Sequence, residues 1–191
     1  MDLLQFINQQ LNDQKTLEML GKSVKAKPSQ VEQLAKLGIP TIMQALNQNA
    51  KSPTKADSLA KALDQHQNDN VDDIESFLKN LDGEDAKKML KHILSDKNDK
   101  VQTTLAKQTG LKANQVTGIL SQLAPLLMGA LAQEKKQQQV DVSGLAGLMQ
   151  GLTSKTSSNN SLMDMVTNML DADNDGSIVD DVGNILKGFM K

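Results

Sequence analysis

The sequence predicts an all-α protein. Hydrophobic residues recur at spacings of three and four along most of the 191 residues, and no stretch longer than a few residues alternates strictly between apolar and polar side chains. Aromatic residues make up only 2% of the chain, whereas it contains 10 methionines. Because sandwiches and barrels draw on aromatic and β-branched residues, this composition favours helices.

The predicted helices are separated by short polar turns that combine helix breakers with capping residues. The clearest turns are Lys27-Pro28-Ser29, Lys51-Ser52-Pro53-Thr54, Leu81-Asp82-Gly83 and Thr109-Gly110-Leu111. The predicted helices span residues 2–11, 14–25, 29–48, 54–65, 71–80, 84–95, 98–109, 113–135, 143–151, 161–170 and 179–190.

An internal repeat becomes visible when the sequence is shifted by 85 positions against itself. The first set of matches pairs Leu20, Lys22, Lys27, Gln30 and Val31 with Leu105, Lys107, Lys112, Gln115 and Val116. The second set pairs Pro40, Met43, Ala45 and Leu46 with Pro125, Met128, Ala130 and Leu131. After a slip of one residue, Leu59-Ala60 matches Leu145-Ala146. The period is too long for an ordinary solenoid repeat. We therefore expect a duplicated multi-helix unit that forms a pseudo-symmetric helical body over residues 1–152, with halves of about 1–80 and 81–152.

Each predicted half places a proline inside its most apolar helix, at Pro40 and Pro125. A proline there removes an amide hydrogen bond, so we expect each helix to be kinked or split. The helix around Pro125 is apolar on almost every face, which is typical of a central helix. We expect the two helices to pack together as a shared core, and we interpret their leucines and methionines as core rather than as the lining of a ligand pocket.

A polar run at residues 153–160 predicts a flexible linker, and residues 161–191 form a separate module after it. The module contains Asp171-Ala172-Asp173-Asn174-Asp175-Gly176-Ser177, which has the spacing of an EF-hand calcium loop between two predicted helices. Calcium needs many oxygen ligands, and this spacing brings three carboxylates and the Ser177 carbonyl around one point.

The loop departs from the usual pattern at its twelfth position, where Val182 replaces the bidentate glutamate. Either Asp181 supplies the missing ligand in an EF-hand-like variant, or the site is incomplete and weak. An acidic capping turn without metal is the alternative interpretation. We predict a calcium site formed by Asp171, Asp173, Asp175, Ser177 and Asp181, with a structural role rather than a sensing role.

A second candidate is the segment from Leu105 to Leu120, which resembles a helix-turn-helix with glycine at its turn. A DNA-reading version would use Lys107, Lys112, Asn114, Gln115 and Ser121, and Lys22, Lys25 and Lys27 give the first half a similar face. However, the second helix runs directly into the apolar segment around Pro125, and every basic residue in the chain is lysine. A tight turn between packed helices is therefore the favoured interpretation.

Other functional classes receive little support from the sequence. The net charge of -2 provides no global attraction for polyanions, and the absence of cysteine removes disulfides and thiolate chemistry. His66, expected in a solvated loop, and His92, expected on a helix face, belong to no catalytic or metal motif, so we expect no enzyme activity. The N-terminus resembles no secretory signal, and the longest apolar stretch is only about ten residues, so we expect a cytoplasmic protein that does not enter the membrane.

Four segments resemble the bacterial domain-of-unknown-function family 937, which is related to the YidB-like proteins: Lys87 to Leu94, Leu105 to Val116, Leu123 to Leu131, and Asp171 to Asp181. The resemblance covers most of the chain, although the first half lacks a clear match to Met89–Leu94. It implies a wholly helical fold and an aspartate-rich glycine loop followed by paired aspartates, but no activity, substrate or catalytic residue.

The sequence thus predicts a non-enzymatic helical interaction or scaffold protein that binds an unknown protein partner and carries a calcium loop near its C-terminus. The alternative is a nucleic-acid-binding helix-turn-helix protein. The oligomeric state stays open.

Overall fold

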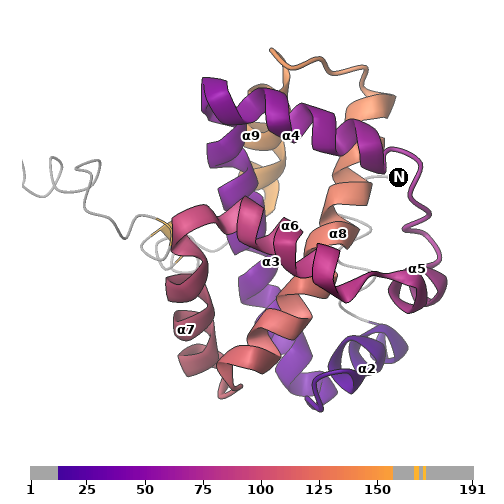
Figure 1. Cartoon of the computed structure of the whole chain (residues 1–191), viewed down its shortest axis with the longest axis vertical. Coiled ribbons are helices and arrows are strands. Elements are labelled where there is room, and N and C mark those ends of the chain that lie inside the picture. Colours follow the sequence, from indigo (N-terminus) through magenta and orange to yellow (C-terminus); the bar gives the residue numbers. More distant parts are fainter. Residues whose placement is uncertain (1–12, 157–165, 168–169, 171–191) are drawn as a thin grey trace, which may run out of the picture.

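The structure is a computed structural model that describes residues 13–156, 166, 167 and 170. All regular elements within these residues are helical, which confirms the predicted fold class (Figure 1). The predicted helices 2–11 and 179–190 and the predicted calcium loop lie outside the described residues.

The helices begin and end close to the predicted positions. They are α2 (Gln14–Lys22), α3 (Pro28–Lys51), α4 (Pro53–His66), α5 (Ile74–Asn80), α6 (Gly83–Leu94), a 3-10 turn (Ser95–Lys97), α7 (Asn98–Thr109), α8 (Ala113–Gln137) and α9 (Leu145–Thr156). Aspartates cap several of them: the Asp13 carboxylate accepts from the Thr16 amide at 2.9 Å, and the Asp73 carboxylate accepts from the Ser76 amide at 3.1 Å. Such side chains satisfy amides that have no partner within the helix.

Two long helices, α3 and α8, cross at the centre of the molecule and supply most of its buried side chains (Figure 1). The contact is close, because a Cβ atom built on Gly38 would lie 2.5 Å from Cδ2 of Leu120. Both helices run through their internal prolines, Pro40 and Pro125, so neither is split. The packing of both helices in the core outweighs the single hydrogen bond that each proline removes.

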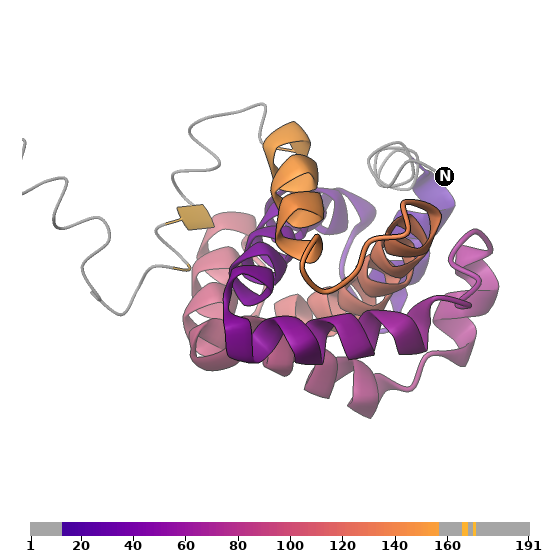
Figure 2. The ribbon, with the colours of Figure 1, turned by 90° about the horizontal axis from the view of Figure 1, so that it is seen from above.

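The remaining helices surround this pair and join the two predicted halves into one core. Helix α2 packs against α3 and α7 packs against α8, while α4 contacts α8 as well as α3, and α9 packs against α3. Figure 2 shows α4 running across the molecule on one side of the central pair. A single hydrophobic cluster contains buried residues from both halves, so the body has one continuous core. Helix α9 continues to Thr156, so the first four residues of the predicted linker are helical.

Helix α8 is the one helix in the described part of the chain that is long and apolar enough to cross a membrane. This is weak evidence for a membrane span, because core helices meet the same criterion. In this fold, 78% of its most apolar window is buried against other helices, which explains its composition.

Candidate functional site

A trough runs along α6 in the described part of the chain, facing α4 at one end and α5 at the other. It consists of two adjacent hollows of about 440 Å³ and about 370 Å³, and His66 and Met89 line both. We call the first the basic hollow and the second the acidic hollow. The basic hollow is lined by Leu46, Asn49, Lys55, Ser58, Leu59, Ala62, Gln65, His66, Lys88, Met89, His92, Ile93, Ser95 and Met128. The acidic hollow is lined by His66, Asp69, Asn70, Ser76, Phe77, Asn80, Leu81, Asp82, Asp85, Ala86, Met89 and Pro125.

The walls of the basic hollow are α4 and α6, which run in opposite directions, and the acidic hollow lies between α5 and α6. Lys55 near the start of α4 donates to Ser95, just beyond the end of α6, across 3.4 Å. At the other end, His66 closes α4 and shares the acidic hollow with Asp85 from the start of α6. Lys55 and His66 are separated by a helical rise of about 16 Å, which is about three turns. The basic hollow is therefore elongated along α4, and the acidic hollow continues from His66 towards α5.

The floor of the basic hollow is apolar and comes from four helices. Leu46 of α3, Leu59 of α4, Ile93 of α6 and Met128 of α8 are all buried beneath it. Asn49 of α3 donates its side-chain amide to the carbonyl of Ile93 at 3.1 Å, which fixes α6 against α3. Because these residues also belong to the central core, the floor is rigid.

The rim carries opposite charges in the two hollows. Four basic side chains, Lys55, Lys88, His66 and His92, line the basic hollow, and no carboxylate lines it. Three carboxylates line the acidic hollow: Asp69, Asp82 and Asp85. The trough is thus polarised along its length.

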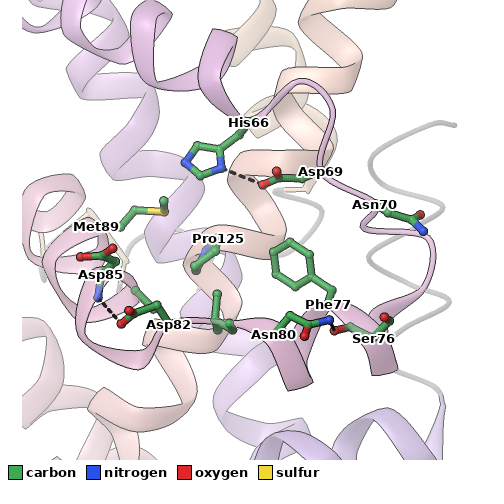
Figure 3. Close-up of a pocket in the computed structure, with 12 residues that line it drawn as sticks. His66, Asp69, Asn70, Ser76, Phe77, Asn80, Asp82, Asp85, Met89 and Pro125 are labelled. Carbon is green, nitrogen blue, oxygen red and sulfur yellow. Dashed lines mark hydrogen bonds and ion pairs between the residues drawn. The ribbon is translucent and has the colours of Figure 1, made fainter.

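His66 lies where the two hollows meet. Its Nδ1 atom is 2.7 Å from Oδ2 of Asp69, and both side chains are half-buried (Figure 3). The sequence predicts a solvated loop here, but His66 is the last residue of α4 and its ring rests against the trough. The aspartate three positions later was the signal for this pairing, since a turn after a helix brings such residues together.

The loop that carries Asp69 is held against α8. Gln133 of α8 donates its side-chain amide to the Asp69 carbonyl at 2.8 Å. Gly129 of α8 leaves room for Val71, whose Cγ1 would lie 2.6 Å from a Cβ at that position. These contacts place the Asp69 carboxylate against His66 and fix the boundary between the hollows.

Asp82 stays ionised because it caps α6. The backbone amides of Asp85 and Glu84 donate to its carboxylate at 3.2 and 2.8 Å, and these bonds hold its pKa below the ordinary value. On the same helix, the bond from Lys88 to the Asp85 carboxylate at 3.0 Å raises the pKa of Lys88. Both signs of charge therefore persist across the physiological pH range.

The acidic hollow combines polar and apolar side chains. Ser76 lies in the acidic hollow, where its backbone amide donates to the Asp73 carboxylate and its carbonyl accepts from the Asn80 side chain. Within the part of the chain that the structure describes, no group of three or more histidines or carboxylates is arranged to hold a metal ion. Phe77 and Pro125 instead add apolar surface between the charged side chains (Figure 3).

Of the side chains predicted to read DNA, two point into the protein. The Gln115 side chain accepts from the Lys112 amide at 3.0 Å and donates to the Val24 carbonyl at 2.9 Å. Ser121 is buried and donates to the Gly118 carbonyl at 3.1 Å. Lys107, Lys112 and Asn114 are exposed. The second helix of the predicted motif is the central helix α8, so most of its length is covered by other helices.

The predicted calcium ligands Asp171, Asp173, Asp175, Ser177 and Asp181 lie outside the described residues. Leu170, directly before the loop, is described and belongs to the hydrophobic core cluster.

The model of one protein family, "Bacterial protein of unknown function (DUF937)", matches residues 5–134 and 132–190. The chain belongs to the DUF937 family. This confirms the family resemblance found in the sequence, and the matched ranges include both the helical body and the aspartate-rich segment. Among curated proteins and among solved structures, none matches this DUF937 chain.

The trough was not predicted from the sequence, although part of its pattern lies within α6. Lys88 and His92 lie one turn apart on α6, as do Met89 and Ile93, so one face of α6 presents an apolar pair beside a basic pair. Which helix faces this pair depends on the tertiary fold, and no local pattern identifies α4 as that partner.

Proposed function

We propose that this protein is a non-enzymatic interaction protein whose trough binds an amphipathic helix of a partner protein. The proposal depends on one observation: an elongated trough with an apolar floor carries basic side chains along one half and carboxylates along the other. Helix-in-groove recognition uses this combination of apolar anchors and flanking charges.

The two signs of charge favour a peptide over a small amphiphile. A ligand with one anionic head group would use Lys55, Lys88 and His92 but would leave the carboxylates of the acidic hollow without a counterpart. A helix can present acidic residues at one end and basic residues at the other. Apolar side chains at helical spacing would then enter the floor, where the flexible side chain of Met89 adapts to their shape.

The test uses a fluorescent synthetic helix of about 14 residues, long enough for the three turns of the trough. It carries leucines on one face, glutamates at one end and lysines at the other. We expect saturable binding by fluorescence anisotropy, weakened about tenfold or more by Lys55→Glu, which places an anion beside the peptide's glutamates. Lys61→Glu is the matched control, because Lys61 is exposed on the same helix but does not line the trough.

A peptide with its charged ends exchanged should lose this sensitivity and bind the Lys55→Glu variant better than the parent peptide does. Equal effects of the two substitutions, or no binding of either peptide, would contradict the proposal. Binding of dodecanoate in place of the peptides would assign the trough to a small amphiphile instead.

We further infer that the helical body arose by duplication of one unit. The repeat in the sequence supports this, and so do the matching surroundings of the central helices. Gln30 accepts from the backbone amide of Lys27 at the start of α3, and its repeat counterpart Gln115 accepts from that of Lys112 at the start of α8. In the repeat, α4 corresponds to α9 and α3 corresponds to α8. Helix α4 packs against α8 and α9 packs against α3, so each half places a helix against the central helix of the other, as expected of interleaved repeats.

We also propose that Asp171, Asp173, Asp175, the Ser177 carbonyl and Asp181 bind one calcium ion. The spacing of these oxygen ligands and the family match across this segment support the proposal. Calorimetric titration of metal-stripped protein should give heat with one-site stoichiometry, and Asp173→Ala should abolish it. Magnesium is the control ion. Absence of heat at millimolar calcium would show that the loop is an acidic turn.

A further inference from the structure

Five exposed lysines gather at one end of the molecule, away from the trough. Lys22, Lys25 and Lys27 surround the turn between α2 and α3, and Lys107 and Lys112 surround the turn between α7 and α8. We call this surface the lysine tip. We propose that the lysine tip binds the phosphate backbone of a nucleic-acid duplex without reading its sequence. This surface is separate from the peptide trough, and the proposal does not depend on it.

The two turns are joined directly by hydrogen bonds. The Gln115 side chain accepts from the amide of Lys112 at 3.0 Å and donates to the carbonyl of Lys25 at 3.4 Å, so one amide group links the two lysines. Gln122 of α8 donates to the Ser23 hydroxyl at 3.2 Å, and Gln33 of α3 donates to the Gln108 carbonyl at 3.3 Å. Figure 1 shows both turns at the same end of the molecule. Residues from the two repeats therefore form one fixed surface.

None of the five lysines forms an ion pair within the described part of the chain, and Glu18, which lines a hollow with Lys22 and Lys25, accepts a hydrogen bond from Gln14. No aspartate or glutamate occurs in residues 19–31 or 100–133, which contain both turns. The nearest acidic side chain after the first turn, Glu32, is paired with Lys36 at 2.6 Å. The tip is therefore a local basic surface on a protein whose net charge is -2.

Three of these lysines occupy backbone positions that favour other residues. Lys25 has a φ of 56°, in the left-handed region where glycine is preferred, and its repeat counterpart is Gly110 with a φ of 67°. Lys27 and Lys112 are the N-cap residues of α3 and α8, where they make no side-chain capping bond and add positive charge to the positive end of each helix. The local structure thus disfavours lysine at each position, which points to a role for the charge itself.

Duplex phosphates fit this surface better than an anionic membrane does. Membrane-binding surfaces insert apolar side chains, and in the described residues the exposed large hydrophobic side chain is Val142, which lies outside both turns. Duplexes carry one charge per about 1.7 Å of axis, and lysine contacts phosphate as a point charge. Because Gln115 and Ser121 are engaged inside the protein and arginine is absent, base reading is not expected.

The experiment measures anisotropy of a labelled DNA duplex of about 20 base pairs between about 50 and 200 mM salt. Five phosphate contacts predict a slope of log affinity against log salt of about -4.5, with little difference between duplex sequences. The double variant Lys25→Gln and Lys112→Gln should reduce that slope by about 2. The control is Lys61→Gln with Lys91→Gln, which removes two exposed lysines from α4 and α6 and should leave the slope nearly unchanged.

Absence of binding at the lowest salt, or equal effects of the two double variants, would overturn the proposal. Vesicles of phosphatidylglycerol are the second probe. If the full-length protein binds vesicles through the tip lysines but does not bind the duplex, the partner is a membrane and the proposal is wrong. Circular dichroism of each variant checks that its helical content is unchanged, and Lys25→Gly, which suits the backbone at that position, provides a second removal of the same charge.

Discussion

Replacing Lys25 with glycine should stabilise the fold, and replacing its repeat counterpart Gly110 with alanine should destabilise it. Both residues lie in the left-handed region, at φ values of 56° and 67°. A non-glycine residue costs about 1 to 2 kcal/mol there. Glycine in turn costs about 0.4 to 1 kcal/mol through the greater freedom of the unfolded chain. The difference predicts about 0.5 to 1 kcal/mol of stabilisation for Lys25→Gly.

The reverse substitution tests the same reasoning without a change of charge. A Cβ atom on Gly110 would meet nothing within 4 Å, so Gly110→Ala changes the backbone energy without a clash. We expect it to lower the free energy of unfolding by about 0.5 to 1 kcal/mol.

Urea denaturation followed by circular dichroism measures both effects, and at this chain length 1 kcal/mol corresponds to about 2 to 4 °C in Tm. Unchanged m values would show that neither substitution alters the surface exposed on unfolding. Destabilisation by Lys25→Gly, or stabilisation by Gly110→Ala, would refute the assignment of backbone strain to the first turn. The lysine would then contribute to folding, and its position would no longer support a role in binding.

Two further predictions concern packing and pH. Gly118→Ala should destabilise the protein by about 1 to 3 kcal/mol through overpacking, because the new Cβ would lie 2.3 Å from Cγ1 of Val24. In a Val24→Ala background the same substitution should be neutral or stabilising, as measured by thermal denaturation. Equal effects in both backgrounds would refute the clash. Bonds from Lys15 and Lys79 lower the pKa of Glu75 to about 2 from 4.5, so the folded state favours its ionised form. That stabilisation is complete above about pH 5 and is lost as the pH falls towards 2. The Tm difference between the protein and its Glu75→Gln variant should therefore shrink over this range at low salt, and a difference that is constant with pH would argue against the ion pairs.

Local patterns predicted the helices well because their boundaries have local causes. The span 98–109 agrees fully with α7, since Gly110 ends the helix in the left-handed conformation. The spans around Pro28 and Pro53 agree within a few residues, because each proline occupies the first turn of its helix. Pro40 and Pro125 do not split their helices, because tertiary packing keeps both continuous, and a kink at each proline stays a prediction.

The site could not be predicted in the same way because it depends on contacts between distant segments. The trough exists because α4 lies beside α6 and because Met128 of α8 reaches its floor. The sequence made Gln115 a candidate DNA-reading side chain, yet its amide donates hydrogen bonds to the carbonyls of Val24 and Lys25, about 90 positions earlier. A sequence pattern shows that a side chain is polar and on a helix, but it does not show which surface that side chain meets.

The two proposed surfaces lie at different positions along one helix. Lys112 caps the start of α8 at the lysine tip, and Met128 of the same helix forms part of the trough floor. Sixteen helical steps separate them by about 24 Å, which exceeds the Debye length of about 8 Å at physiological ionic strength. This distance separates the basic hollow from the tip, whereas Leu81 of the acidic hollow also lines a hollow with Ser23, Val24 and Asn114 beside the tip.

Coupling between the two surfaces would require an element with two arrangements. The helix that connects them is the most buried one in the core, and close contacts at Gly118, Gly129 and Leu120 restrict its movement against its neighbours. We therefore expect saturating peptide to leave the duplex affinity within about twofold of its value in the free protein, as measured by anisotropy at constant salt. A larger change would show that α8 shifts when the trough is filled, and the protein would then act as a switch. Independent binding instead makes it a scaffold that holds a partner helix at one end and a polyanion at the other.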